Sequence, residues 1–529
     1  MISRQNKSGR DQAKTTLLVL SIHLILASGL VLPGTGLAAQ SHVLPIEVDS
    51  SLAARLDHPV DAPVDLTSYM TLVGGSLDLG TLQVAEVDSS GTPLDPGVLF
   101  QFDPDPGFDP ALQASGTLVF VMDGVTPAVT TRYYQLWFDV IGACGDCPSP
   151  PAVPVPVTVD SLTYENQLTY VVDTPRAVYK YHTEGAGLAS MIDNDSQDWI
   201  AFHDIAGSKS AGEYRGLPNL VFQSGQLENS FFHPGFTNAH SNIVNSGPLK
   251  VTVFSETDVP GNLWQVLWEF YPTFARITVQ TVGTSNGGDY WFLYEGVVGG
   301  LMDAGDEVIR SSGPQTSAFD YAFSWEEVLP VPSWVYFRDL SAPRILYLSD
   351  DMGDADEDSY RPQGQTSGST PEMTVFGFGR VLNTSPDKLV PRMSGAGRTF
   401  TFGFGEDYTA AGGAIAAASK PLTIVVGNPY GGPSPVGDDG VPGAAILQQN
   451  FPNPFNPRTV ISFSLPVSSR VRLDILDLRG RMVANLVDGV MAPGSHSVTF
   501  DGKDLPSGIY ISRLTTGQGS RERKMTLLR

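Results

Sequence analysis

Short apolar runs, each about the length of one β-strand, recur along most of this chain and end at Gly or Pro residues. The 529 residues include 55 Gly and 40 Pro, and only 17% are charged, which is the balance of a turn-rich β protein. Within the first 160 residues, four runs alternate apolar and polar positions as half-buried strands do. We therefore predict an all-β chain with few helices. The four runs are Leu77–Val87, Val98–Phe102, Gly116–Met122 and Tyr133–Val140.

The length of the chain requires several folded units, because a single hydrophobic core stops growing at about 250–300 residues. We predict two antiparallel β-sandwiches, residues 40–159 and 160–426, followed by a small Ig-like β-sandwich, residues 446–529. The Pro-rich stretch 148–156 predicts a stiff connector. Residues 427–445, with Asn-Pro, Gly-Gly-Pro and Asp-Asp-Gly, predict a flexible linker.

The first 39 residues have the layout of a signal peptide. A cationic start, Arg4–Lys14, precedes an apolar run, Leu17–Leu32, and the small residues Gly36, Ala38 and Ala39 suit cleavage. An N-terminal membrane anchor is the alternative, but Pro33 ends the apolar run short of the ~20 residues that a membrane span needs. No later segment is apolar enough to span a membrane. We predict export, and a secreted or outer-surface location.

Charge is unevenly distributed along the chain. The net charge is −24, but residues 1–39 carry four Lys/Arg against one acid and residues 446–529 carry eleven against six. Residues 40–445 therefore hold 17 basic and 49 acidic side chains, a net charge of −32. Such a field repels polyanions at long range, so we predict no nucleic-acid partner and disfavour a lyase acting on polyuronates, unless a local basic pocket overrides the sum.

The two cysteines, Cys144 and Cys147, lie in a Gly- and Pro-rich context. A redox Cys-x-x-Cys motif normally begins a helix that lowers the thiol pKa, and Pro148, Pro150 and Pro151 prevent a helix here. We predict a small local disulfide. A metal half-site is the alternative, although we can place no partner ligands for it.

The C-terminal module, residues 446–529, carries several motifs in a fixed order. Two Asn-Pro steps with Phe451 and Phe455 predict a rigid turn that closes one end of a sandwich. Alternating apolar residues in 471–475 predict one buried strand face, and Asp477–Gly480 predicts a hairpin turn. The motifs are LQQNFPNPFNP at Leu447–Pro457, Thr459–Leu465, Val471–Leu478, Arg479-Gly480-Arg481, Gly494–Phe500, Ser507-Gly508-Ile509-Tyr510 and Lys524-Met525.

These motifs resemble the type A C-terminal sorting domain of type IX secretion cargo, and the related Ig-like domain named after the flagellar hook-capping protein. The resemblance covers about 84 residues. It implies export across an outer membrane by a secretion machinery, followed by release or surface attachment. The alternative is an Ig-like domain with no sorting role.

One stretch of the large unit gathers residue types found in sugar-binding sites. Aromatic rings stack on the apolar face of a pyranose, while charged side chains on loops hold its hydroxyls. We therefore predict that this unit binds carbohydrate. The residues are His182, His203, His233 and His240, the segments Glu213–Asn219 and Phe231–Gly235, then Trp268-Glu269, Arg276, Tyr290–Gly296 and Asp350–Pro362.

The large unit resembles the large β-sandwich proteins of the galactose-mutarotase type. The resemblance rests on the segment Val178–Trp199, with Gly185-Ala186-Gly187 and the acidic run 193–198, and on the loops just described. That fold is shared by aldose epimerases and by domains of several polysaccharide lyases and glycosidases. The resemblance covers about half of the chain at fold level, and no family motif matches residue by residue.

An enzyme of that kind would use a His as acid, a Glu as base and an Arg to hold an oxygen. The predicted catalytic residues are His233 as the acid, Glu295 or Glu213 as the base, and Arg215 as the residue whose guanidinium holds a sugar oxygen. The alternative is that Arg215 and Glu213 form an ordinary inter-strand ion pair, and that His233 before Pro234 closes a turn.

A cation site is a further hypothesis. Asp350–Asp358 holds five Asp and one Glu in nine residues, and alternate carboxylates, Asp354, Asp356 and Asp358, can converge on Ca²⁺. Counted from Asp354, an EF-hand loop would have Gly at its sixth position and Glu at its twelfth, where this chain has Ser359 and Gln365, so a solvated acidic turn is the alternative. A His233/His240 metal centre fits neither helical nor strand spacing well.

Three functions from different classes follow from the sequence. The first is a secreted or surface protein that binds glycans through the large sandwich. The second is a carbohydrate-active enzyme: an epimerase, a lyase or a hydrolase. The third is a structural surface-layer or adhesion component. No pair of acids stands out at the spacing of a hydrolase.

Overall fold

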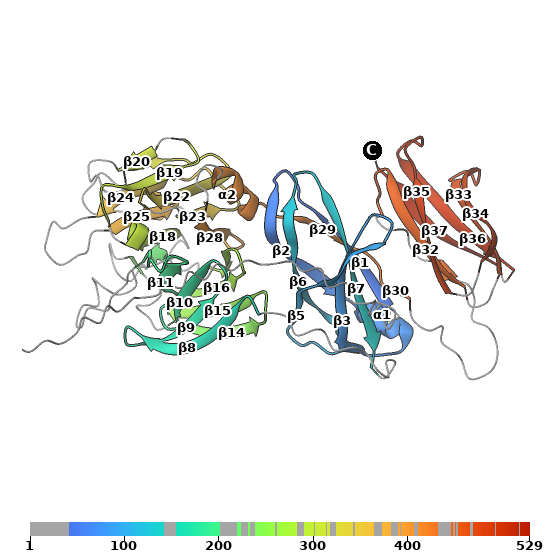
Figure 1. Cartoon of the computed structure of the whole chain (residues 1–529), viewed down its shortest axis with the longest axis horizontal. Coiled ribbons are helices and arrows are strands. Elements are labelled where there is room, and N and C mark those ends of the chain that lie inside the picture. The colour runs from blue at the N-terminus through green and yellow to red at the C-terminus, as the bar shows by residue number, and fades with distance from the viewer. Residues whose placement is uncertain are drawn as a thin grey trace, which may run out of the picture. The chain divides into compact units, whose positions relative to one another are not determined.

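The computed structural model describes most of the chain after residue 41 (Figure 1). The predicted signal peptide, residues 1–39, and both cysteines lie outside the described part. The described residues are 42–141, 155–200, 219–223, 231–232, 239–259, 262–282, 290–300, 302–313, 315–317, 324–341, 344–363, 373–381, 390–391, 393–406, 411–431, 446–447, 450, 453–465, 469–491, 494–517 and 519–528.

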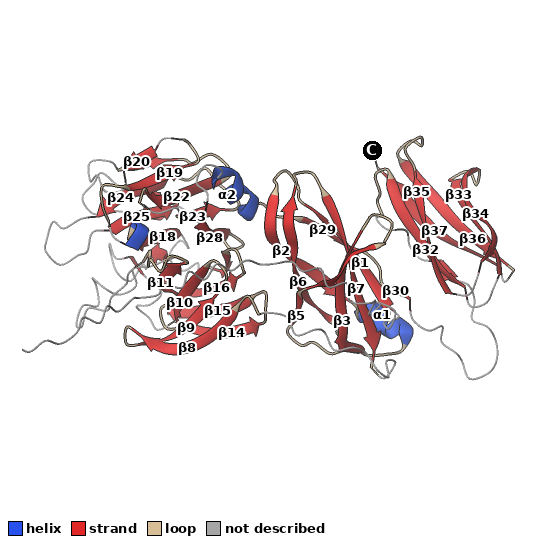
Figure 2. Ribbon diagram, viewed as in Figure 1, coloured by secondary structure: helices blue, strands red, loops and turns tan. Residues whose placement is uncertain are grey.

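Antiparallel strands dominate these residues, as Figure 2 shows, and the prediction of an all-β chain is confirmed. Within the described part, the helices are α1 (Thr67–Val73), the 3₁₀ turn η2 (Val298–Gly300) and α2 (Ala411–Ser419).

The first sandwich packs two sheets around one core. Inward residues alternate with outward ones along each strand, for example Leu44, Ile46 and Val48 against Phe120 and its neighbours. One sheet has the order β29–β1–β7–β3–β4, with β30 also pairing β1, and the other has the order β2–β6–β5. The strands are β1 (His42–Asp49), β2 (Arg55–Asp65), β3 (Leu77–Val87), β4 (Pro93–Val98), β5 (Phe100–Pro104), β6 (Ser115–Thr126), β7 (Thr131–Val140), β29 (Thr423–Val426) and β30 (Tyr430–Gly431).

One edge strand of this sandwich, β29, comes from residues that the predicted division of the chain assigned to the large unit, which was expected to end at residue 426. β29 pairs with β1, Ile46 opposite Val426, so these residues complete the first sandwich. Residues 427–431, expected to begin a flexible linker, continue along β1: the Gly427 N–H donates to the Pro45 carbonyl at 2.9 Å, and β30 pairs with the start of β1. The sequence pattern shows that a strand is apolar and short, but not which distant strand it joins.

The large body comprises strands β8–β28 and is built on a nine-stranded sheet of order β14–β15–β16–β17–β28–β23–β22–β19–β20. Its strands are β14 (His240–Ser246), β15 (Val251–Val259), β16 (Asn262–Phe270), β17 (Ala275–Thr281), β28 (Thr399–Gly405), β23 (Ile345–Asp350), β22 (Ser333–Asp339), β19 (Asp306–Arg310) and β20 (Gln315–Ser317).

Smaller sheets share a core with this large one. A six-stranded sheet has the order β13–β12–β18–β25–β24–β21, and a four-stranded sheet has the order β11–β10–β9–β8. The core is mostly aromatic and includes Tyr179, Trp268, Phe292 and Phe402. The strands are β13 (Phe231–Phe232), β12 (Asn219–Gln223), β18 (Tyr290–Gly296), β25 (Met373–Phe378), β24 (Asp358–Gln363), β21 (Trp325–Glu327), β11 (Gly187–Asp193), β10 (Ala177–His182), β9 (Gln167–Asp173), β8 (Thr158–Tyr164), and the pair β26 (Arg380–Val381) and β27 (Val390–Pro391).

The C-terminal module is a sandwich of two sheets, β31–β32–β35 and β34–β33–β36–β37. The predicted buried positions Val471, Leu473 and Ile475 are all fully buried, which confirms the strand pattern. The strands are β31 (Ile446–Leu447), β32 (Arg458–Leu465), β33 (Ser469–Asp477), β34 (Met482–Met491), β35 (Gly494–Asp501), β36 (Gly508–Thr516) and β37 (Gly519–Leu527).

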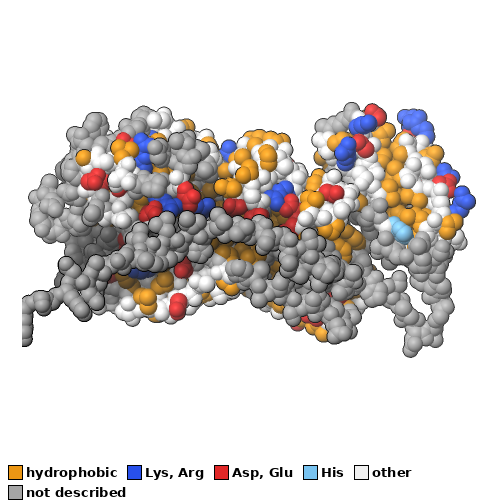
Figure 3. Space-filling view, in the orientation of Figure 1, with side chains coloured by type: hydrophobic (Ala, Val, Ile, Leu, Met, Phe, Trp, Pro, Cys, Tyr) orange, Lys and Arg blue, Asp and Glu red, His pale blue; other side chains and the backbone are white. Residues whose placement is uncertain are grey.

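Local chemistry explains the turns of this module. The Asp477 carboxylate accepts the N–H groups of Arg479 and Arg481, and Gly480 has the positive φ of 74° that this turn needs. Phe455 is 1% exposed and bonds through its backbone to the last strand, so it closes one end of the sandwich as predicted; Phe451 lies outside the described residues. Figure 3 shows Lys and Arg side chains on the visible face of the module.

Candidate functional site

The strongest candidate site lies on the face of the six-stranded sheet that points away from the main core. Along β18, Tyr290, Phe292 and Tyr294 enter that core, so Trp291 and Glu295 point to the opposite face. Trp291 packs there in a separate apolar cluster that includes Leu293, Met373 and Val375.

Strand register brings an acid and a base together on this face. Glu295 on β18 and Arg361 on β24 both lie opposite Val375 on the intervening strand β25. The three residues form one row across the sheet, with neighbouring Cα atoms about 4.5–5.5 Å apart. Glu295 and Arg361 thus flank Val375, although they are 66 positions apart in the chain.

Arg380, just after β25, lies over the same face. A Cβ atom at Gly377 would lie 2.8 Å from the Arg380 Cβ and Cδ atoms, so only glycine lets this side chain lie flat on the strand. The Arg380 guanidinium carbon is 5.9 Å from the centre of the Trp291 ring, a distance at which a cation is attracted to an aromatic face. We call Trp291, Glu295, Arg361 and Arg380 the arginine face.

The arginine face holds buried hydrogen-bond donors that have no acceptor. Arg380 is 3% exposed, and its Nε and Nη1 atoms have no hydrogen-bond partner; Nε of Arg361 has none either. Burial, then the neighbouring charge of Arg361, lowers the pKa of Arg380 to about 10, and Glu295 opposes this. Arg380 still carries its charge at neutral pH, so the face presents two adjacent cations with unused donors, which is suited to an anionic oxygen ligand.

The predicted catalytic residues are only partly placed. Glu295 belongs to the arginine face, while His233, Arg215 and Glu213 lie outside the described residues. Sequence reasoning placed Arg361 among the sugar-site residues without giving it a role, and it missed Arg380. The Gly-Phe-Gly-Arg run at 377–380 is the signal that a long side chain could lie against glycine there.

The predicted Ca²⁺ ligands have protein partners in the structure. Arg398 donates to Asp350 and pairs with Asp354, with nitrogen–oxygen distances of 2.6 Å in both pairs. Asp358 is buried and accepts the backbone N–H groups of Leu329 and Gly379. The site at Asp354, Asp356 and Asp358 stays a prediction.

Within the described part of the chain, one group of three acidic side chains has ligand oxygens within 4.8 Å of one another: Asp303, Asp306 and Asp339. Sequence reasoning did not single out these residues. His240, the partner of His233 in the predicted metal centre, is exposed at the start of β14.

A second concentration of buried charge lies where the first sandwich contacts the large body. The Lys250 Nζ atom is 3.1 Å from Asp61, 3.1 Å from Asp103 and 3.4 Å from Glu269, and its side chain is 5% exposed. Burial by itself would lower the pKa of Lys250, but the three carboxylates outweigh burial and raise it. Gln101 of β5 accepts the Lys250 N–H at 2.9 Å, so both side chain and backbone are held.

A pocket of about 350 Å³ lies beside this ion cluster. Its polar lining includes His58, Arg276 and Asp351. Burial, then the charges of Arg55 and Arg276, lowers the pKa of His58 to about 3, and burial raises the pKa of Asp351 to about 8. Both side chains are therefore neutral at pH 7.

The C-terminal module has a recognisable family. Residues 449–527 match the family described as the secretion system C-terminal sorting domain. These residues are a type IX secretion C-terminal sorting domain, which confirms the resemblance seen in the sequence, and the protein is secreted to the cell surface or outside the cell. Such a domain implies interaction with the secretion machinery. None of the helices in the described part of the chain has the length and hydrophobicity of a membrane span.

Three similar solved structures share at most 12% of their sequence with this chain, and no curated protein matches its sequence. A protein in glycosyl hydrolase family 38 from Enterococcus faecalis is 9% identical, with a TM-score of 0.40; the match covers 87% of this chain and 58% of the length of that protein. HI1317 is 12% identical, with a TM-score of 0.33, over 47% of this chain and 96% of that one. PorZ, an essential surface component of the type IX secretion system of Porphyromonas gingivalis, is 11% identical, with a TM-score of 0.13, over 79% and 64%.

The likeness of the large body to galactose-mutarotase-type sandwiches stays a prediction.

Proposed function

We propose that the protein is a secreted carbohydrate-binding protein whose large body binds sugars carrying a carboxylate on the arginine face. The unused donors of Arg380 and Arg361 carry this proposal. A buried donor without an acceptor costs about 1–3 kcal/mol, and more when it is charged, so a ligand that supplies the acceptor recovers that cost. A sugar carboxylate matches the planar fork of a guanidinium.

The neighbours of the two arginines support a sugar over a simple anion. The Trp291 ring, which is 2% exposed, lies within cation–π distance of Arg380 and forms an apolar wall beside it. Glu295, across Val375 from Arg361, can accept a hydroxyl hydrogen. The arginine face would also supply local positive charge within an acidic region of net charge −32. A local basic pocket of this kind lets a polyanion bind despite the net negative charge.

The test is a glycan array of uronate-containing and neutral oligosaccharides, probed with the full-length protein and followed by calorimetric titration of the best ligand. Uronate-containing ligands should bind, and Arg361→Gln and Arg380→Gln should each weaken binding by about 10-fold or more, the effect of losing a charge-assisted hydrogen bond. Arg338→Gln, which removes an arginine paired with Glu307, is the matched control and should leave affinity unchanged.

Thermal melting of each variant separates lost binding from lost folding. A preference for neutral glycans, or undiminished binding by folded Arg361→Gln and Arg380→Gln proteins, would show that the arginine face is not the binding site.

Catalysis is a second candidate because Glu295 lies in the same row as Arg361. Product analysis after incubation with the bound glycan would show new reducing ends, unsaturated products or an altered anomer. In an enzyme, Glu295→Gln should bind the glycan but lose turnover by at least 100-fold, in keeping with a general acid–base role. Neither binding nor turnover would leave a structural surface or adhesion role.

A further inference from the structure

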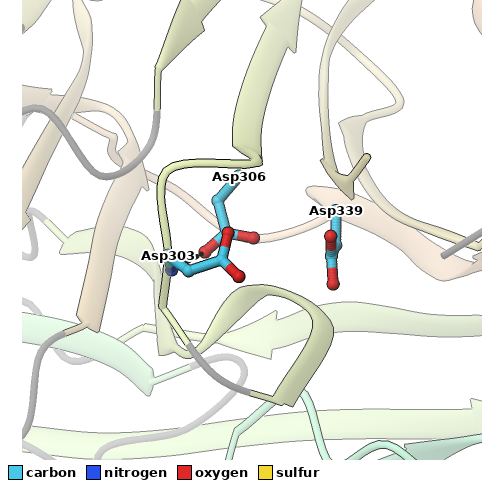
Figure 4. A group of neighbouring side chains, drawn as sticks. All are labelled: Asp303, Asp306 and Asp339. Carbon is cyan, nitrogen blue, oxygen red and sulfur yellow. Dashed lines mark hydrogen bonds between the residues drawn. The ribbon is translucent and has the colours of Figure 1, made fainter. Parts of the chain in front are cut away.

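The acidic group Asp303, Asp306 and Asp339 lies where two neighbouring strands of the nine-stranded sheet meet a turn. Asp306 begins β19, directly after the turn that contains Asp303, and Asp339 ends β22. The register of β19 and β22 places Asp306 opposite Asp339. Figure 4 shows the carboxylates of Asp303 and Asp306 side by side, facing Asp339. Two like charges directly opposite each other destabilise a sheet.

Hydrogen bonds fix the carboxylates in this arrangement. The Asp303 N–H donates to Oδ2 of Asp306 at 2.7 Å, and the Gly305 N–H donates to Oδ1 of Asp303 at 2.6 Å. The Ser341 N–H and hydroxyl donate to the two oxygens of Asp339. A Cβ atom at Gly299, which has a positive φ of 59°, would lie 2.5 Å from Oδ2 of Asp339, so η2 closes tightly on that carboxylate.

One oxygen of the group is left without any partner. Asp306 is 0% exposed, and its Oδ1 atom has no hydrogen-bond donor. A buried carboxylate oxygen without a donor is costly, because burial removes its water and nothing replaces it. This orphan oxygen is a separate observation from the proximity of the three acids, and it lies within the same group.

The described residues supply no cation to this group. No ion pair in the described part of the chain includes Asp303, Asp306 or Asp339, and the arginines of β19 and β22, Arg310 and Arg338, pair with Glu327 and Glu307. Burial, together with the charges of Asp303 and Asp339, raises the pKa of Asp306 to about 8.

We propose that Asp303, Asp306 and Asp339 bind a calcium ion that joins the turn before β19 to the end of β22. The three ligand oxygens lie within 4.8 Å of one another, about twice a Ca²⁺–oxygen distance of 2.3–2.6 Å, so one ion can contact all three. The donor set is all oxygen, which suits Ca²⁺ and not the nitrogen and sulfur preferences of Zn²⁺. Since Ca²⁺ takes six to eight oxygens, backbone carbonyls and water would supply the others.

Calcium titration of the full-length protein, stripped with EDTA, tests the site by calorimetry and by displacement of bound Tb³⁺. We expect binding with a Kd of about 0.1–1 mM, the range of extracellular Ca²⁺ modules. Asp306→Asn and the exposed Asp303→Asn should each weaken it by at least 10-fold. Asp356→Asn, in the acidic turn that the sequence suggested, is the matched control and should leave it unchanged.

Thermal melting adds a readout that a merely structural aspartate would not give. In EDTA, Asp306→Asn should melt at or above the temperature of the wild type because a buried carboxyl group between two other acids is replaced by a neutral amide, yet gain nothing from Ca²⁺, whereas the wild type gains a few degrees. No binding at millimolar Ca²⁺ would overturn the proposal. So would binding that persists in Asp303→Asn and Asp306→Asn but disappears in Asp356→Asn. If Asp306→Asn does not fold, Asp303→Asn decides alone, since that side chain is exposed.

Discussion

The C-terminal module and the large body are both built from antiparallel strands, but they place their charges differently. In the module, arginine side chains lie at the surface: Arg470 is 76% exposed and Arg481 79%. In the large body, several charges with candidate roles are buried, among them Lys250, Arg380 and Asp306. A module recognised by a secretion machinery can therefore be identified from contiguous motifs, whereas the role of a buried charge depends on the strands packed around it.

The largest expected effect separates delivery from stability. Deleting residues 446–529 should abolish delivery to the cell surface, because the sorting domain is removed. It should leave the unfolding of the remainder unchanged when followed by tryptophan fluorescence, since all seven Trp residues lie before residue 446. Cell fractionation with a surface-labelling reagent measures delivery. Normal surface labelling of the shortened protein would show that the module is not needed for export.

The next effect compares a buried cation with an exposed one. Lys250→Met should lower the free energy of unfolding by about 3–5 kcal/mol, because Asp61, Asp103 and Glu269 lose their buried counter-charge. Lys503→Met, at an exposed position of the C-terminal module, should change it by less than about 0.5 kcal/mol. The Lys250→Met variant is measured by urea unfolding followed by tryptophan fluorescence. The Lys503→Met variant lies in a module without tryptophan, so its stability is measured by hydrogen exchange. Equal small effects would mean that the buried cluster is not stabilising.

The next effect is a smaller one, the dependence of stability on pH. It concerns residues before 446, where all seven Trp residues lie. The pKa of Asp351 is about 8 in the folded protein and about 3.9 when unfolded. Between these values the folded state keeps a proton that the unfolded state has lost, so the stability from this group is full below pH 4 and is lost as the pH rises through 8.

Asp351→Asn should therefore remove a slope of up to about 1.4 kcal/mol per pH unit between pH 5 and 8. Urea unfolding at several pH values, followed by tryptophan fluorescence, measures it, and Asp488→Asn in the C-terminal module is the control. An unchanged slope in Asp351→Asn would assign the titration to other groups.

The smallest effect tests the hairpin of the C-terminal module. Gly480→Ala should destabilise it by about 1–2 kcal/mol, because Gly480 has a φ of 74° that a Cβ disfavours, although nothing lies within 4 Å of such an atom. Gly489→Ala, also free of contacts and without a positive φ, should be within about 0.5 kcal/mol of the wild type. Hydrogen exchange in residues 469–491 measures both. Equal exchange in the two variants would contradict a backbone origin for the strain.

Local features of the fold could be predicted from the sequence because they depend on neighbouring residues. Alternation at Val471, Leu473 and Ile475 and the turn at Asp477–Gly480 follow from side-chain periodicity and from the hydrogen bonds of one Asp. The candidate sites depend on register between strands that are far apart in the chain.

Glu295 could be found because it follows an aromatic run. Its relation to Arg361 could not, because it rests on the strand that lies between them. The same holds for Asp306 and Asp339, which are 33 positions apart and become neighbours only through the pairing of β19 with β22 (339 − 306 = 33). A period-two pattern shows which face a residue takes, but it does not show the residue opposite.

The pairing of β29 with β1 has a consequence for the order of folding. The first sandwich begins at His42, but its edge strand arrives only with Thr423, so the sheet cannot be completed until the whole large body has been synthesised. Until then β1 presents an unpaired edge, the kind of surface on which strands of other chains aggregate. A ribosome that stalls before residue 423 would therefore release a chain whose first domain is open on one side, and which depends on chaperones or rapid degradation.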